Sequence, residues 1–422
     1  MTTMKIIHGR VIDPSMNRDE TADVLIKDGT ITAIDQINED ADTVIDAKGC
    51  IVAPGFVDGH VHFRDPGFTY KEDIHTGARA AAHGGYTTVI MMANTRPVID
   101  CPEVLDGVLA KGRETAIHVY SAACVTKFME GKELTDFAEL KKHGAVLLTD
   151  DGLPILNSAV ATEAMEEAVR NDMMLSFHEE DPELIYIKGI NDGETARKLG
   201  MKGARASAEE ILVARDVVLS RATGAHIHIQ HVSSGFTVDL VRKAKKDGIH
   251  VTCEVTPQHF SLNESIVKEK GTLAKVNPPI RTEKDRQEIL EGIKDGTIDI
   301  IATDHAPHSK EEKLRPFPQA PSGMIGLETA LGLGILKLVQ PGIISMSQLI
   351  SMMSTRPAQL FRLNAGSLQE GKPADLVIFN PKKTWTAGNY LSKASNSPFT
   401  GMELPGVVEY TICDGKIAYQ SQ

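Results

Sequence analysis

The sequence lacks the features of membrane-spanning, secreted and nucleic-acid-binding proteins. Its 422 residues contain no apolar stretch near the roughly 20 residues that a membrane-spanning helix needs. The N-terminal segment has no long apolar core, so we expect no signal peptide. Acidic residues (57) outnumber Lys and Arg (45), and the formal net charge of −12 disfavours binding to nucleic acid or to a membrane surface.

Cysteine is scarce and scattered. None of the five cysteines forms a Cys-x-x-Cys pair; they are Cys50, Cys101, Cys124, Cys253 and Cys413. This pattern favours reduced thiols over a disulfide framework or a zinc ribbon, and we expect a cytoplasmic location. The apolar content of 41% and the charged content of 24% are ordinary for a globular protein.

Both ends of the chain predict short β-strands joined by turns. Turn signals such as Asp28-Gly29 and Asp414-Gly415 separate short apolar segments. The expected strands are 5–7, 23–27, 30–34 and 43–46 near the N-terminus, and 375–379, 407–413 and 416–419 near the C-terminus. We expect residues 1–52 and 364–422 to form one small composite β domain.

The middle of the chain alternates apolar runs with helical segments. The eight runs are 51–57, 87–92, 117–124, 145–149, 173–177, 226–230, 250–255 and 298–303. The helical segments include 73–83, 134–142, 159–170, 208–221, 284–293 and 326–339. This alternation predicts an α/β fold, a (β/α)8 TIM barrel over residues 53–363. A doubly wound open sheet is the rival, but no Gly-x-Gly-x-x-Gly opens a helix.

Histidines and acids follow these runs at the position where a barrel places its chemistry, the carboxyl ends of the strands. They are His60 and His62 after the first run, Asn94 after the second, Asp150 and Asp151 after the fourth, His178 after the fifth, His231 after the sixth, Asn277 beyond the seventh, and Asp304 after the eighth. His60 and His62 share one face of an extended segment, so both imidazoles can reach one ion. The pattern predicts a metal site.

Four imidazoles and two carboxylates are more ligands than one tetrahedral ion needs. We expect two ions, one held by His60, His62 and Asp304 and the other by His178 and His231, with an aspartate after the fourth run as the bridge. Nitrogen and oxygen ligands suit zinc, and manganese, cobalt and nickel stay open. Two ions about 3.5–4 Å apart share a hydroxide that is nucleophilic at neutral pH, which indicates metal-assisted hydrolysis or its reversal.

Several of these stretches together resemble the amidohydrolase superfamily and, within it, the bacterial dihydroorotase family. They are 58–67, the turn at Asn94, 150–152, 277–281, 303–308, 326–329 and the stretch 366–376 that leads into the C-terminal strands. The resemblance covers nearly the whole chain. It implies the reversible cyclisation of N-carbamoyl-L-aspartate to L-dihydroorotate and water, a step of pyrimidine (UMP) biosynthesis.

The resemblance also implies residue roles. Asp304 would be the general acid and base beside the hydroxide, and Arg64 would bind the substrate carboxylate as a planar bidentate donor. Further substrate contacts carried over from the family are Asn94, Asn277 and His308. Ser322, before Gly323, departs from the bulkier aromatic that related sequences often carry, and we expect the backbone at Ser322 and Gly323 to contact the substrate. The segment 308–324, rich in charge and proline, is either a pocket wall or a mobile lid.

One departure separates this chain from its cousins. Hydantoinases and many dihydroorotases bridge their metals with a carboxylated lysine, but residues 145–156 contain no lysine. Spacing does not separate Asp150 from Asp151 as the bridge, and the resemblance favours Asp151. The alternatives are another cyclic-amide hydrolase, such as a hydantoinase or allantoinase, and a silent scaffold for aspartate transcarbamoylase. Association with that transcarbamoylase stays open for an active enzyme too, and a homodimer is the expected assembly.

Two polar residues next to the expected ligands have supporting roles in this interpretation. Asp58 lies one step deeper than the histidines, where anchoring the backbone or an imidazole is expected. His305 should face away from the metal and support the site from behind. The histidines that are not at a strand end are expected to be surface or structural residues; they are His8, His75, His83, His118, His143, His226, His228, His250 and His259.

Overall fold

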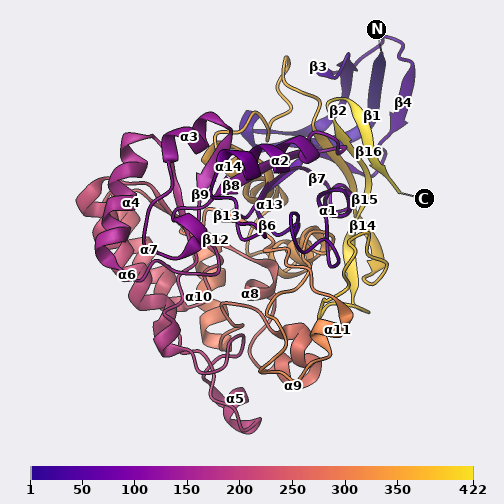
Figure 1. Cartoon of the computed structure of the whole chain (residues 1–422). Coiled ribbons are helices and arrows are strands. Elements are labelled where there is room, and N and C mark those ends of the chain that lie inside the picture. The colour runs from indigo at the N-terminus through magenta and orange to yellow at the C-terminus, as the bar shows by residue number, and fades with distance from the viewer. Residues whose placement is uncertain (1, 422) are drawn as a thin grey trace.

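The computed structural model describes residues 2–421, which form two eight-stranded sheets. The strands of the first sheet are β1 (Thr3–Asp13), β2 (Arg18–Lys27), β3 (Thr30–Asp35), β4 (Thr43–Asp46), β5 (Ile51–Pro54), β14 (Leu376–Thr386), β15 (Glu403–Cys413) and β16 (Lys416–Gln420). They are ordered β16-β15-β14-β5-β1-β2-β3, and β4 pairs with β1. β5 joins the two ends of the chain, because it pairs in parallel with β1 and antiparallel with β14. Both termini therefore lie on this sheet (Figure 1).

The second sheet is the predicted barrel. Its strands are β6 (Phe56–Val61), β7 (Tyr86–Met91), β8 (His118–Ala123), β9 (Ala145–Leu148), β10 (Leu175–Phe177), β11 (Ile227–Ile229), β12 (Val251–Val255) and β13 (Ile300–Ile301). They are parallel and pair in chain order from β6 to β13. A parallel bridge between Val61 and His305 brings the first and last strands together, and the His62 N–H donates to the His305 carbonyl at 2.9 Å. The barrel prediction is confirmed.

Helices follow the strands and cover the outside of the barrel (Figure 1). They are α1 (Ile74–His83), α2 (Pro102–Gly112), α3 (Phe137–Lys142), α4 (Ser158–Arg170), α5 (Glu194–Lys198), α6 (Ser207–Thr223), α7 (Gly235–Lys246), α8 (Pro257–Ser261), α9 (Ile266–Lys270), α10 (Glu283–Lys294), α11 (Lys310–Lys313), α12 (Ala330–Gly334), α13 (Met346–Ile350) and α14 (Arg356–Leu360). Single turns of 3₁₀ or π helix are η1 (Pro14–Met16), η2 (Lys127–Met129), η3 (Pro182–Leu184), η4 (Gly271–Ala274), η5 (Ile335–Val339) and η6 (Ser351–Thr355). None of the helices within residues 2–421 has both the length and the apolar composition to cross a membrane.

The sequence explains where the longer helices begin. Asp73 caps α1 and Thr282 caps α10, each in a capping box with the third residue of its helix. Inside the barrel a small apolar cluster of Ile90, Met92, Ala122, Leu147, Met174, Ile300 and Phe361 fills the space below the polar mouth. Met92 and Met174 are thus buried core residues.

The prediction of one strand over residues 51–57 was wrong. The structure divides this run between β5 and β6, which lie in different sheets. The chain changes sheet at Gly55, whose N–H donates to the Asp375 carbonyl, while the next N–H, of Phe56, donates to the Gly85 carbonyl. A Cβ at Gly55 would lie 2.2 Å from the Thr87 hydroxyl oxygen, so only glycine fits this crossing. The uniformly apolar composition of the run hides the break.

Candidate metal centre

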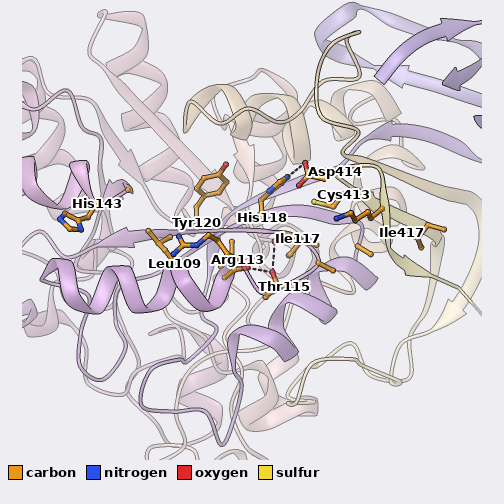
Figure 2. Close-up of a pocket in the computed structure, with 16 residues that line it drawn as sticks. Leu109, Arg113, Thr115, Ile117, His118, Tyr120, His143, Cys413, Asp414 and Ile417 are labelled. Carbon is orange, nitrogen blue, oxygen red and sulfur yellow. Dashed lines mark hydrogen bonds and ion pairs between the residues drawn. The ribbon is translucent and has the colours of Figure 1, made fainter. Parts of the chain in front are cut away.

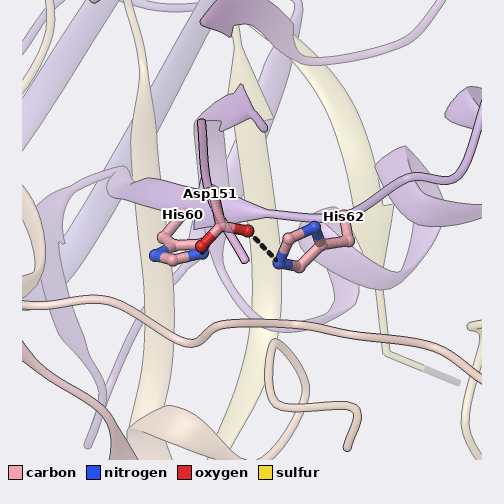
Figure 3. A group of neighbouring side chains, drawn as sticks. All are labelled: His60, His62 and Asp151. Carbon is pink, nitrogen blue, oxygen red and sulfur yellow. Dashed lines mark ion pairs between the residues drawn. The ribbon is translucent and has the colours of Figure 1, made fainter. Parts of the chain in front are cut away.

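Six side chains meet at the carboxyl ends of the barrel strands. His60 is in β6 and His62 follows it, while Asp151, His178, His231 and Asp304 follow β9, β10, β11 and β13. Donor atoms of His60, His62 and Asp151 lie within 4.8 Å of one another, and so do those of Asp151, His178 and His231. Asp151 is thus common to two groups of possible metal ligands. Figure 3 shows its carboxylate between His60 and His62.

The distances around Asp151 and Asp304 suit atoms that share a metal ion. Oδ1 of Asp151 lies 3.6 Å from His60 Nε2, 3.5 Å from His178 Nδ1 and 3.8 Å from His231 Nε2. Its Oδ2 lies 3.4 Å from His62 Nε2. Oδ1 of Asp304 lies 3.1 Å from His62 Nε2 and 3.7 Å from His60 Nε2. Ligand atoms around a zinc ion with bonds of about 2.0–2.2 Å are separated by roughly this much.

The outer nitrogen of each of three histidines is held by a second acceptor. Nδ1 of His60 donates to Glu254 at 2.7 Å, and Nδ1 of His62 donates to Asn94 Oδ1 at 3.0 Å. Nε2 of His178 lies 3.3 Å from Glu180. These contacts decide which nitrogen faces the centre, as is usual for metal-binding imidazoles. The inward Nε2 of His60 is buried and has no hydrogen-bond partner among the described residues.

Electrostatics of the cluster favour a cation. Burial opposes ionisation of Asp151, but the surrounding imidazoles outweigh it and hold the pKa of that carboxyl well below its ordinary value. Burial likewise opposes the charged form of His178, yet Asp151 and Glu180 raise its pKa to about 9. Without metal the site therefore holds protons between its carboxylates and imidazoles. A divalent ion that binds there must displace them.

Asp150 and Asp151 face in different directions. Asp150 accepts hydrogen bonds from the Val125 N–H at 2.8 Å and from the Thr126 hydroxyl at 2.5 Å, so it holds the neighbouring loop. Burial raises its pKa to about 6. Only Asp151 points at the imidazoles. The structure thus places Asp151, and not Asp150, where a bridging ligand would lie.

Asp58 and His305 have the supporting positions that the sequence predicts. Asp58 accepts from the His60 N–H at 3.0 Å and from the Thr303 hydroxyl at 2.5 Å, so it ties β6 to β13. His305 turns away from the metal ligands: its Nδ1 accepts from the Gly326 N–H, and its Nε2 lies 3.4 Å from Glu72. Both predictions are confirmed.

The expected substrate residues Arg64, Asn94 and Asn277 lie around the centre. Nε of Arg64 donates to the Pro307 carbonyl at 3.3 Å, and its terminal nitrogens make no hydrogen bond to any of residues 2–421. Nδ2 of Asn94 donates to Asp151 at 3.1 Å and its Oδ1 accepts from His62, so both of its polar atoms hold metal-ligand candidates. Oδ1 of Asn277 is buried and has no partner among the described residues. It lines a cavity of about 190 Å³ together with His178.

Among the expected substrate contacts of the segment 308–324, His308 bonds to Ser322, and Gly323 bonds to two lysines. Nε2 of His308 donates to the Ser322 carbonyl at 2.8 Å. Burial lowers the pKa of His308 to about 3, which keeps the imidazole neutral. The Gly323 N–H donates to the Lys275 carbonyl at 2.8 Å, and the Gly323 carbonyl accepts from Lys313 at 2.9 Å.

Two buried lysines hold the segment 308–324 in place. Nζ of Lys275 donates to the carbonyls of Phe317 and Ala320 at 2.6 and 2.7 Å. Nζ of Lys313 donates to the carbonyl of Pro321 at 3.0 Å as well as to Gly323. These contacts are those of a fixed wall.

Three residues at the mouth of the barrel have strained backbone conformations. Arg64, His231 and Asp304 have positive φ values of 60°, 31° and 48°. Non-glycine residues in this region each cost about 1–3 kcal/mol and occur mainly where a side chain must be aimed. The sequence carries no signal for this strain.

Sequence reasoning missed Glu254 and its partner His228. Glu254 is 1% exposed and accepts from His60 Nδ1, from His228 Nε2 at 3.2 Å and from the His231 N–H at 3.3 Å. A carboxylate inside the apolar run 250–255 is unusual and was the available signal. His228 is buried and structural, as expected. Glu180, which contacts His178, had no comparable signal.

Comparison with known proteins identifies the class of the fold and site. The model of a family described as dihydro-orotase-like matches residues 49–236. An L-hydantoinase (dihydropyrimidinase) from Arthrobacter aurescens superposes with a TM-score of 0.87 at 24% identity, covering 99% of this chain and 96% of that one. A D-hydantoinase (dihydropyrimidinase) from Thermus sp. gives 0.83 at 25% identity, covering 99% and 95%. These superpositions place the fold in the class of the hydantoinases.

Relatives that match over the full length of the chain identify its family. The chain is 54% identical to a dihydroorotase of Clostridioides difficile (strain 630) and 48% identical to one of Lactococcus lactis subsp. lactis (strain IL1403). Each alignment covers at least 99% of this chain and at least 99% of the relative. The chain belongs to the dihydroorotase family.

Proposed function

We propose that this chain catalyses the reversible cyclisation of N-carbamoyl-L-aspartate to L-dihydroorotate and water. The structural observation behind the proposal is the position of Asp151, whose carboxylate lies within reach of both histidine pairs at the carboxyl ends of the strands. Relatives of about 50% identity over the full length bear the name dihydroorotase, which supports this substrate over other cyclic amides.

Two divalent ions, with zinc as the expected metal, fit the residues present. His60, His62 and Asp304 would hold one, and His178 and His231 the other, with Asp151 shared. The unpartnered inward nitrogen of His60 and the absence of a thiol from both groups fit a nitrogen and oxygen site. When bound, such ions lower the pKa of a water molecule and polarise the amide carbonyl.

Asp304 would move the proton. Burial opposes its ionisation, but a hydrogen bond from His62 and nearby imidazoles keep its pKa below the ordinary value, so it is a carboxylate ready to accept. In ring opening it takes the proton lost by the attacking water and gives it to the departing ring nitrogen. In cyclisation it returns the proton in the opposite direction.

Arg64 and Asn277 would orient the substrate. The Pro307 carbonyl fixes Nε of Arg64, which sets the plane of the guanidinium while its terminal nitrogens remain available for a carboxylate. The unpartnered Oδ1 of Asn277 offers an acceptor for a ring N–H beside His178. Asn94 would act on the substrate through His62 and Asp151, which it contacts.

The test is ring opening of L-dihydroorotate by zinc-loaded protein, with hydantoin and allantoin as parallel substrates. We expect turnover of L-dihydroorotate alone. Arg64→Met should lower kcat/KM by about 10²-fold or more, since a charge-assisted bidentate contact contributes about 3 kcal/mol in a buried site. Arg96→Met is a matched control outside the ligand set and should retain activity.

Other outcomes would identify a different function. Turnover of hydantoin or allantoin in place of L-dihydroorotate would indicate another cyclic-amide hydrolase. The absence of both bound metal and turnover of any of the three would indicate a scaffold such as a silent partner of aspartate transcarbamoylase. Either result would overturn the proposal.

The assembly and location remain predictions. A homodimer and association with aspartate transcarbamoylase follow from the family resemblance and are tested by sedimentation of the chain alone and mixed with the transcarbamoylase. A cytoplasmic location is supported by the cysteines, all five of which are free, since a reducing compartment keeps thiols unpaired.

A further inference from the structure

A third group of metal-binding side chains lies at the other end of the barrel from the candidate metal centre. His118 is the first residue of β8, and Cys413 and Asp414 lie where β15 ends. Donor atoms of these three residues lie within 4.8 Å of one another, the same spacing that unites each group at Asp151. Figure 2 shows the His118 ring, on the barrel side, beside Cys413 and Asp414 of the C-terminal hairpin.

A fourth donor completes the group. Asp375 is 3% exposed, and its Oδ2 lies 3.0 Å from His118 Nε2. Oδ1 of Asp414 lies 3.8 Å from the same nitrogen. The Cys413 thiol is buried, with its sulfur 3.8 Å from the Thr87 carbonyl. One imidazole therefore faces two carboxylates and a thiol.

The backbone fixes this arrangement. Cys413 pairs with Lys416 across a two-residue turn in which Asp414 and Gly415 have φ values of 48° and 71°. The Asp414 N–H donates to Asp375 Oδ1 at 2.8 Å, so the turn is held against the start of β14. The positions of these donors are thus set by the hairpin and not by chance contact of long side chains.

The donor set suits a borderline divalent ion. Thiolate, imidazole and carboxylate are the three ligand types that zinc takes, at about 2.3, 2.0 and 2.1 Å. Burial, Asp375 and Asp414 together raise the pKa of the Cys413 thiol. A bound cation would reverse this effect and deprotonate the sulfur. A cavity of about 780 Å³, lined by the three residues, gives an ion access from solvent.

We propose that His118, Cys413 and Asp414, with Asp375, form a structural zinc-type site that joins the barrel to the C-terminal hairpin. It is separate from the candidate metal centre and does not depend on the proposed function. The carboxylate of Asp414 is 61% exposed and is the group free to move toward the ion. The competing interpretation is an ion pair between His118 and Asp375 that needs no metal.

Cobalt(II) distinguishes the two interpretations, because both groups at Asp151 lack a thiol. Metal-free full-length protein is titrated with Co²⁺ while near-ultraviolet absorption is followed. We expect a thiolate-to-cobalt charge-transfer band in the wild-type protein. Cys413→Ser should abolish this band and should bind one equivalent of metal fewer than the wild type. Asp414→Asn, at an exposed position, should keep the fold and weaken this binding by about tenfold or more.

Cys101→Ser is the control, because Cys101 is the only one of the five cysteines that is not buried and belongs to none of the groups of possible metal ligands within residues 2–421. This variant should leave the band unchanged. Circular dichroism of each variant shows that it is folded. Absence of the charge-transfer band in cobalt-loaded protein would overturn the proposal. So would a band that survives Cys413→Ser, because the thiolate would then lie elsewhere.

Discussion

Replacing Glu254 by glutamine should weaken metal binding without removing a metal ligand. The carboxylate is fully enclosed and accepts from His60 Nδ1 at 2.7 Å and from His228 Nε2 at 3.2 Å. A glutamine has the same shape but must turn its NH₂ group toward one of these N–H donors. A hydrogen bond to a buried charged group contributes about 1.5–3 kcal/mol, which is about 10- to 150-fold in affinity at 1.36 kcal/mol per factor of ten. We expect zinc affinity to fall by about 10- to 100-fold.

The assay is competition for zinc between the protein and a chromogenic chelator at fixed pH, for wild type and Glu254→Gln. Glu264→Gln is the matched control, because Glu264 is also buried and accepts from the Thr195 N–H at 3.2 Å, away from the metal centre. The control should change stability but not zinc affinity. Zinc affinity of folded Glu254→Gln within twofold of wild type would refute the reasoning.

Four further predictions follow from the same structure. Asp58→Ala should lower the free energy of unfolding by about 2 kcal/mol or more in urea titrations, because the buried Thr303 N–H and hydroxyl lose their acceptor. An unchanged urea concentration at the midpoint of unfolding would contradict this prediction. Lys313→Met should speed proteolysis within 308–324 by about tenfold or more, whereas Lys310→Met should not, since Lys313, unlike Lys310, donates to carbonyls of this wall. Equal rates would favour a mobile lid. Burial lowers the pKa of His226 from 6.5 to about 4, so between these pH values the unfolded chain binds more protons than the folded chain, and metal-free protein should lose stability as pH falls from about 6.5 to 4. His226→Gln should make the free energy of unfolding less dependent on pH in this range. An unaltered pH dependence would show that His226 is not its cause. Chelation of metal from wild type should lower the melting temperature, because an ion that binds only the folded state stabilises it; readdition of zinc should restore it.

The barrel and the clustering of the candidate metal ligands were predictable because both follow local rules. Strand and helix alternate along the chain, and parallel strands bring their carboxyl ends to one mouth. Residues at the carboxyl ends of different strands, such as His60 and His178, therefore had to lie close together. The expected position of Asp58, one step below His60, followed from the period of two in an extended segment.

Features that depend on tertiary contacts were not predictable in the same way. Asp150 and Asp151 are adjacent, and only the loop that receives Asp150 shows which one faces the histidines. The change of sheet at Gly55 lies within a run that is apolar on both sides, so composition does not mark it. Glu254 acts on a histidine 194 residues away, and no spacing along the chain indicates that pair.

Asp151 is shared by the two groups of possible metal ligands. This shared position is tested most directly by measuring bound zinc in Asp151→Ala. This variant is made in a Cys413→Ser background, so that only zinc at the candidate metal centre is counted. Equilibrium dialysis followed by elemental analysis gives the metal per chain, and ring opening of L-dihydroorotate is measured on the same samples. We predict two equivalents of zinc and full turnover for Cys413→Ser alone. Adding Asp151→Ala should leave less than one equivalent and lower turnover by about 10³-fold or more. Two equivalents of zinc and undiminished turnover after loss of Asp151 would contradict the account.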